Sequence, residues 1–198
     1  MCFSKLIFLK KKQKIIIAES SIAFSVFQIL KKFFKTVLVE RENVKLKKLM
    51  ESELIIFSFS ESTSWKKINF WAKHSSLPIL IVVFSQHLSP EIEEFAENFP
   101  SSGYLVANFD DKKLRELSKK TGGYGLTFGF EEGANLRATD CHFDEKGVSF
   151  KLNFNGNILP VWLSDQADRK RVYTALAILS IAQILNLNLV EVSKALHN

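Results

Sequence analysis

Runs of apolar residues alternate with amphipathic segments along the first two-thirds of the chain. Six runs predict β-strands: Lys14–Ala18, Thr36–Glu40, Glu53–Phe59, Leu77–Phe84, Tyr104–Asn108 and Gly125–Phe128. Four segments with helical spacing lie between them: Ile22–Phe33, Trp65–His74, Glu91–Phe99 and Lys112–Lys120. The run Leu77–Phe84 is continuously apolar, as in strands that are buried on both faces. The pattern therefore predicts an α/β fold with a mainly parallel sheet and helices on both faces.

The hydrophobic pattern changes after Gly129, where strand-like segments follow one another without helical segments between them. Three alternating segments separated by turn residues predict a small antiparallel ribbon over about 135–163: Asn135–Phe143, Gly147–Asn155 and Ile158–Leu163. A long helix over Arg169–Leu185 and a short one carrying Val192 and Leu196 complete the predicted elements.

Composition narrows the class of protein. The 198 residues are 46% hydrophobic and 24% charged, which suits one globular domain over 1–198. The net charge is +6, but the lysines are spread in small groups, so we expect no specific nucleic-acid partner. Two cysteines are too few for a disulfide framework, and we expect a reduced, cytoplasmic protein. The segment 1–12 predicts a first strand with a lysine turn, neither a secretion signal nor a membrane span.

Four segments in the second part of the chain stand in a recognisable order. They are VANFDD (106–111), LTFG (126–129), ANLRATDCHFDEKGVSFKL (134–152) and VYTALAILSIAQILNLNLVEVSKAL (172–196). Together they resemble the second half of the central domain of the Mur ligases, over about 80–196, whereas 1–79 shares only the rhythm of strands and helices. The resemblance implies that domain's P-loop-like fold. By descent it also implies ATP- and magnesium-dependent addition of amino acids to UDP-N-acetylmuramoyl precursors of peptidoglycan.

Some family residues have counterparts in this chain. The family's Asn-x-Asp-Asp is matched by Asn108, Asp110 and Asp111, and its histidine near the metal and phosphates is matched by His87. The two aspartates could bind magnesium or a ribose hydroxyl, or they could cap the helix that follows, because a carboxylate there accepts backbone N–H bonds. A histidine in a surface turn is the alternative for His87.

Other family motifs have no counterpart. The glycine-rich phosphate loop is replaced by Glu19, Ser20 and Ser21, where the serines could hold an anion at a helix N-terminus or simply cap the helix. The lysine that helps to hold a second metal falls around 93–95, where the chain has none. The adenine-binding asparagines fall within 168–174, where Arg169 and Arg171 could instead grip a phosphate or an acidic partner.

These departures predict a degenerate member of the family. We expect no catalytic residue, no metal site and no firmly bound cofactor, because the groups that neutralise ATP phosphates are missing. The family's ligases also use an N-terminal and a C-terminal domain, and 198 residues have room only for the central one. We therefore expect a chain that is inactive alone and binds or assembles with another Mur ligase. The alternatives are a residual nucleotide or UDP-sugar binding module, or one piece of a split ligase. The oligomeric state is left open.

Overall fold

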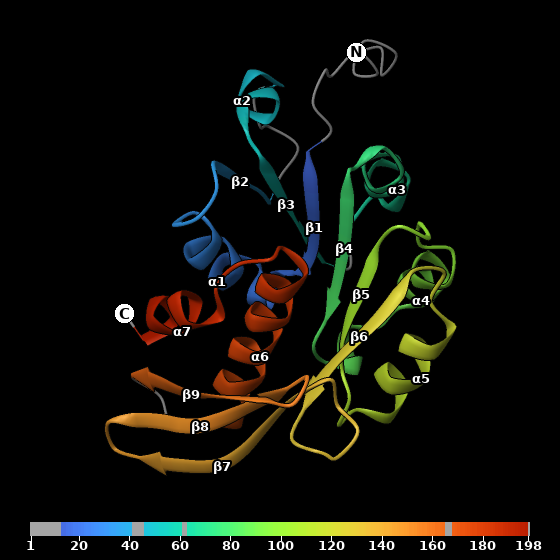
Figure 1. Ribbon diagram of the computed structural model, residues 1–198. Coiled ribbons are helices and arrows are strands. Elements are labelled where there is room, and N and C mark those ends of the chain that lie inside the picture. Colours follow the sequence, from blue (N-terminus) through green and yellow to red (C-terminus); the bar gives the residue numbers. More distant parts are fainter. Residues whose placement is uncertain (1–12, 41–45, 61–62, 165–167, 198) are drawn as a thin grey trace.

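The computed structural model describes residues 13–40, 46–60, 63–164 and 168–197. Its strands form one sheet in the order β2-β3-β1-β4-β5-β6-β7-β8-β9 (Figure 1). The strand and lysine turn predicted within residues 1–12 lie outside the described residues.

Six strands form the parallel part of the sheet: β1 (Lys14–Glu19), β2 (Thr36–Val39), β3 (Leu54–Phe59), β4 (Leu77–Val82), β5 (Tyr104–Asn108) and β6 (Tyr124–Gly129). All neighbouring pairs among them are parallel. The continuous apolar sequence of β1 and β4 follows from this position, because helices cover both faces of these strands. Ile15 and Ile17 face one hydrophobic core, and Ile16 and Ala18 face the other.

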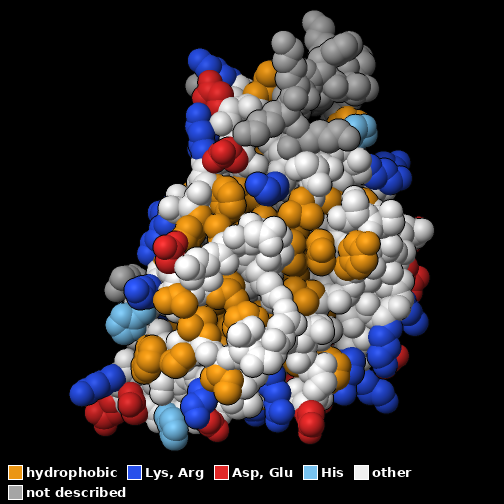
Figure 2. Space-filling view, viewed as in Figure 1, with side chains coloured by type: hydrophobic (Ala, Val, Ile, Leu, Met, Phe, Trp, Pro, Cys, Tyr) orange, Lys and Arg blue, Asp and Glu red, His pale blue; other side chains and the backbone are white. Residues whose placement is uncertain are grey.

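Two helical layers enclose the parallel strands. On one face lie α1 (Ser20–Leu30), α6 (Arg169–Ile184) and α7 (Leu189–His197). On the other lie α3 (Trp65–His74), α4 (Pro90–Glu97) and α5 (Lys112–Lys120). Figure 2 shows hydrophobic side chains gathered in the middle of the visible face and charged side chains mainly around its edge. The α/β prediction, with helices on both faces of a mainly parallel sheet, is confirmed.

The predicted antiparallel ribbon is also confirmed. It consists of β7 (Leu136–Asp144), β8 (Gly147–Phe154) and β9 (Asn157–Ser164). Asn155 and Gly156 turn the chain between β8 and β9 with φ of 46° and 75°, as expected for a tight hairpin of the right twist. The ribbon joins the parallel strands through only two pairs, Phe128 with Leu136 and Gly129 with Arg137.

Two short elements were not predicted from the sequence. Helix α2 (Leu46–Glu51) falls in the charged segment before β3, and the 3-10 helix η2 (Ser85–His87) follows β4. Leu49 of α2 packs against the core shared with α3, α4 and α5. None of the helices within the described ranges has the length and apolar character needed to cross a bilayer.

The order of the strands creates a crevice at their carboxyl ends. The chain leaves β1 toward α1 on one face, but it leaves the neighbouring strands β3 and β4 toward α3 and α4 on the other face. Ligands of open α/β sheets bind where neighbouring connections diverge in this way. We therefore expect a ligand site at this edge of the sheet.

Candidate functional site

A cavity of about 530 Å³ lies at the carboxyl ends of β1, β3 and β4. Glu19, Ser20 and Ser21 line one side, and Phe59 and Trp65 belong to its apolar lining. Among the described residues that line it, none is a lysine or an arginine. The cavity thus offers hydroxyl groups, aromatic rings and one carboxylate.

Glu19 ends β1 and is only 2% exposed. Its Oε1 accepts hydrogen bonds from the backbone N–H of Val83 at 2.7 Å and of Phe84 at 3.3 Å, both just beyond β4. The hydroxyl of Ser21 donates to Oε2 at 3.3 Å. A buried carboxylate is stable only when such donors replace water. Glu19 therefore ties the start of α1 to the end of β4.

The serines do not cap α1 as expected. Glu19 holds the N-cap position without a side-chain capping bond, and Ser20 is already the first residue of the helix. The capping interpretation for Ser20 and Ser21 is wrong, because the carboxylate of Glu19 turns inward to Val83 and Ser21 donates to it. Both serines line the cavity, so their role toward an anion stays a prediction.

Asp111 is the N-cap of α5, as one of the two interpretations predicted. Its side chain accepts from the backbone N–H of Lys113 at 3.0 Å and of Leu114 at 3.4 Å, and Oδ2 accepts from the N–H of Ser85 at 3.2 Å. Partial burial opposes ionisation, but the hydrogen bonds, that of the Ser85 side chain first, hold the pKa of Asp111 below its usual value. This carboxylate fastens the segment after β4 to α5.

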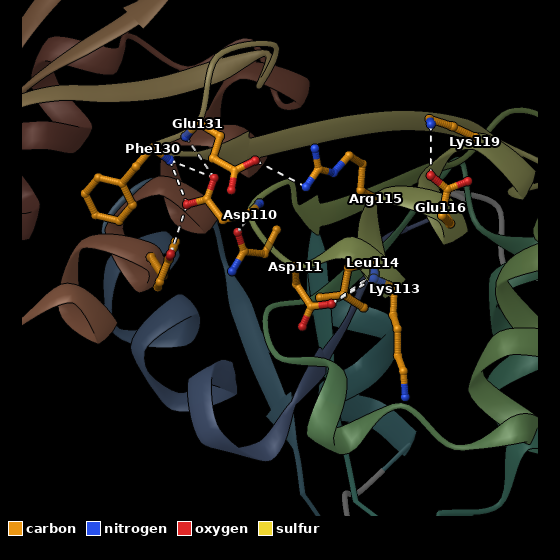
Figure 3. Close-up of polar contacts among 11 residues, drawn as sticks. Asp110, Asp111, Lys113, Leu114, Arg115, Glu116, Lys119, Phe130 and Glu131 are labelled. Atoms are coloured by element: carbon orange, nitrogen blue, oxygen red, sulfur yellow. Dashed lines mark hydrogen bonds and ion pairs between the residues drawn. The ribbon is translucent and has the colours of Figure 1, made fainter.

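Asp110 has a different role, and the capping interpretation is wrong for it. Both of its oxygens accept from the N–H of Phe130, at 2.8 and 3.1 Å, and Oδ1 also accepts from Glu131 at 2.9 Å (Figure 3). Tyr173 of α6 donates its hydroxyl to Oδ2 at 2.9 Å. Asp110 therefore points away from α5 and joins three parts of the chain: the end of β5, the segment after β6, and α6.

Asn108 is buried beside these aspartates. Its amide donates to the carbonyl of Val83 at 3.2 Å, and its Oδ1 accepts from the N–H of Asp110 at 3.1 Å. The structure thus brings Asn108, Asp110 and Asp111 together at the end of β5, where protein donors and acceptors bind each of them. Among the described residues, no group of three or more His, Cys, Asp and Glu side chains could hold a metal ion.

Tyr173 was not identified from the sequence. Burial, the hydrogen bond to Asp110 and the negative charge of that carboxylate raise its pKa to about 12. Its ring meets those of Phe84 and Phe130 edge-on, at 6.2 and 5.1 Å between centroids. The only sequence signal was a tyrosine beside the apolar positions of the long helix, which does not indicate a partner 63 residues away.

The two arginines at the start of α6 point to different places. The guanidinium of Arg169 lies 4.5 Å from the centre of the Phe130 ring, a cation–π distance. Arg171 donates from Nη2 to the carbonyl of Ser164 at 3.1 Å and lines a second cavity, away from the crevice. The two charges therefore do not converge on one site. Asp168 caps α6 by accepting from the N–H of Arg171.

His87 lies in η2, the short helix that follows the carboxyl end of β4. Its side chain is outside the described part of the structure. The proposed ligand-binding role of His87 therefore stays a prediction.

Comparison with known proteins finds two kinds of similarity, although no family model matches the chain. UDP-N-acetylmuramate–L-alanine ligase of Alkaliphilus metalliredigens is 26% identical over 110 residues, which are 55% of this chain and 24% of that protein. The ligase of the same name from Aquifex aeolicus is 27% identical over 158 residues, 75% of this chain and 34% of that protein. The chain thus spans about a quarter to a third of the length of these relatives.

Similarity to solved structures covers nearly the whole chain. The crystal structure of MurF ligase from Thermotoga maritima in complex with ADP superposes with a TM-score of 0.70 at 18% identity, over 95% of this chain and 48% of that one. At this identity the match establishes a shared fold.

Proposed function

The chain carries a Mur ligase family central domain, and from this premise we propose that it acts in peptidoglycan-precursor synthesis without forming an acyl phosphate from ATP. In this proposal the domain is non-catalytic and cytoplasmic, and it works by binding to a true Mur ligase. The relatives' names supply the pathway, and the geometry around Glu19 supplies the argument against catalysis.

The observation that carries the proposal is the position of Glu19. Phosphates bind at the end of a first β-strand through free backbone N–H groups and a cation. Here the carboxylate of Glu19 already accepts the N–H groups of Val83 and Phe84, and no lysine or arginine is among the described residues that line the cavity. Because a second anion would meet a buried negative charge, these residues do not fit the phosphates of ATP.

The aspartates support the same conclusion. A magnesium ion next to phosphates needs carboxylate oxygens that face the ion. Asp110 accepts from Phe130, Glu131 and Tyr173, whereas Asp111 accepts from three backbone N–H groups of the segments around it. Both carboxylates therefore serve the fold, and binding magnesium would require them to give up these bonds.

Calorimetry with Mg-ATP tests the first part of the proposal, using an active UDP-N-acetylmuramate–L-alanine ligase as the positive control. We expect no heat of binding for this chain at millimolar ligand, and no phosphate release with UDP-N-acetylmuramate and L-alanine. Saturable binding of Mg-ATP or UDP-N-acetylmuramate without turnover would replace the proposal by a nucleotide or UDP-sugar binding module. Turnover would reject it outright.

Two variants distinguish the two physical causes that would prevent ATP from binding: repulsion by the charge of Glu19, and occupation of the backbone N–H groups by its carboxylate. Glu19→Gln removes the charge and keeps the shape of the side chain, and Glu97→Gln removes an exposed charge of α4 as the matched control. If repulsion dominates, Glu19→Gln gains measurable affinity for Mg-ATP and Glu97→Gln does not. If neither variant gains affinity, occupation of the Val83 and Phe84 N–H groups is the stronger cause.

Binding of this chain to a true Mur ligase is tested by a separate measurement. The purified chain is titrated into the UDP-N-acetylmuramate–L-alanine ligase of the same cell and followed by sedimentation. We expect a complex of defined stoichiometry. Independent sedimentation of the two proteins at high micromolar concentrations would reject this partner.

A further inference from the structure

A second cavity, of about 340 Å³, opens on the opposite face of the sheet from α3, α4 and α5. Residues of α1, β9, α6 and α7 line it, and it shares no lining residue with the crevice that contains Glu19. We call it the α1/α6 groove. The α1/α6 groove is therefore spatially separate from the crevice.

The charges of the groove have one sign. Lys32, in the turn after α1, and Arg171 of α6 line it, and no aspartate or glutamate does so among the described residues. Lys32 uses one of its three ammonium donors for the carbonyl of Ala195, at 3.2 Å. The potential in the groove therefore favours an anion, whereas the crevice repels one.

Arg171 carries an unused donor. Its Nη2 donates to the carbonyl of Ser164, but the buried Nε–H has no acceptor among the described residues. Buried donors without partners are rare in folded proteins, and each one calls for a specific explanation. The Nε–H and a neighbouring Nη–H of a guanidinium form the fork that binds both oxygens of a carboxylate.

The rest of the lining is largely apolar. Ile29, Ala175, Ile178 and Leu196 form part of it, together with Phe24, which is 56% exposed. An inorganic anion would leave these side chains in contact with water, whereas an alkyl chain attached to the anionic group would cover them. The lining thus combines a cationic end with an apolar wall.

We propose that the α1/α6 groove binds an organic carboxylate that carries an apolar chain. The carboxylate pairs with Arg171 and is attracted by Lys32, and the apolar chain lies against α1 and α6. This site is independent of the proposed function, because it uses neither the crevice nor a partner ligase.

Nuclear magnetic resonance titrations of the full chain with acetate, butyrate and hexanoate test the proposal, with sodium chloride at equal ionic strength as the control. We expect saturable shifts for the amides of Gln28, Lys32 and Thr174, which all belong to groove residues. Affinity should rise roughly fourfold for each CH₂ group that becomes buried. Shifts that grow linearly and match those of sodium chloride would overturn the proposal.

Two substitutions on the same helix give a matched comparison. Arg171→Met should weaken hexanoate binding at least tenfold, since it removes a charge-assisted pair. Arg169→Met should leave binding unchanged, because that guanidinium lies over Phe130, outside the groove lining. Equal effects of the two substitutions would overturn the assignment.

Lys32→Met provides a second test if Arg171→Met does not fold, because Lys32 is an exposed residue of the turn after α1. We expect weaker hexanoate binding by a few-fold, and unchanged binding would count against the site. Inorganic phosphate is the remaining probe. Saturable phosphate binding without hexanoate binding would overturn the choice of an organic carboxylate.

Discussion

Replacing Asp110 by alanine should destabilise the protein more than replacing its neighbour Asp111. Asp110→Ala removes the acceptor of the Phe130 N–H, the Glu131 N–H and the Tyr173 hydroxyl. The Glu131 bond is exposed, so water replaces it at little cost. A hydrogen bond to a charged group contributes about 1.5–3 kcal/mol, so the two half-buried bonds give a loss of roughly 3–6 kcal/mol in the free energy of unfolding.

Asp111→Ala is the matched control. It removes a helix cap, at about 1 kcal/mol, and the half-buried bond from the Ser85 N–H, at about 1.5–3 kcal/mol, for a loss of roughly 2.5–4 kcal/mol. Urea unfolding of both variants, followed by circular dichroism, gives the two free energies. The account of Asp110 as a tie between three segments would be refuted by a cost no greater than that of Asp111→Ala.

A double-mutant cycle with Tyr173→Phe sharpens the test. The substitution keeps the ring contacts with Phe84 and Phe130 and removes only the hydroxyl. We expect a cost of about 1.5–3 kcal/mol in the wild-type background and almost none in Asp110→Ala. Equal costs in both backgrounds would show that the two side chains are not coupled.

Three further predictions follow from the same cluster. The stability that Tyr173 adds through its neutral hydroxyl is fully present below pH 10 and is lost as the pH rises toward 12, where the folded-state hydroxyl ionises. The phenolate absorbance of the wild type, after subtraction of that of Tyr173→Phe, should therefore have its midpoint near pH 12. The lowered pKa of Asp111 contributes stability above pH 3.8 that is lost as pH falls through the folded-state value. Urea midpoints of Asp111→Asn should therefore fall less steeply in acid than those of the wild type. Gly129→Ala would place a Cβ 2.8 Å from Cγ of Asp110 and should displace that carboxylate, so its unfolding cost should not add to that of Asp110→Ala.

Local patterns predicted most of the elements because their physical causes are local. The run LPILIVVF is apolar at every position because β4 is covered on both faces, and the charged sequence KKLRELSKK places only Leu114 and Leu117 in the core. Both signals are visible in the sequence alone. Helix α2 was missed because its six residues, LKKLME, are too few to establish a helical period.

The roles of the site residues could not be predicted in the same way, because they are set by contacts between residues that are distant in sequence. Asp110 and Asp111 are adjacent and chemically identical, yet one caps a helix while the other reaches Phe130 and Tyr173, 20 and 63 residues away. In the sequence Glu19 is only a replacement within the glycine-rich loop. Its burial and its bonds to Val83 and Phe84 depend on β1 and β4 lying side by side. The likeness to the Mur ligases gave the fold of these segments, but it did not indicate the hydrogen-bond partners of each carboxylate.

The two-pair junction between β6 and β7 has a consequence for how the chain folds. Each pairing within β7, β8 and β9 joins residues that are close in sequence, whereas β1 pairs with β4, whose residues lie more than 50 positions later in the chain. Hairpins close in microseconds, and distant strand pairing is slow because a long loop must close first. We therefore expect the strands of the ribbon to pair with one another early, and the apolar face of the ribbon to pack against α6 and α7 later, when their shared core forms.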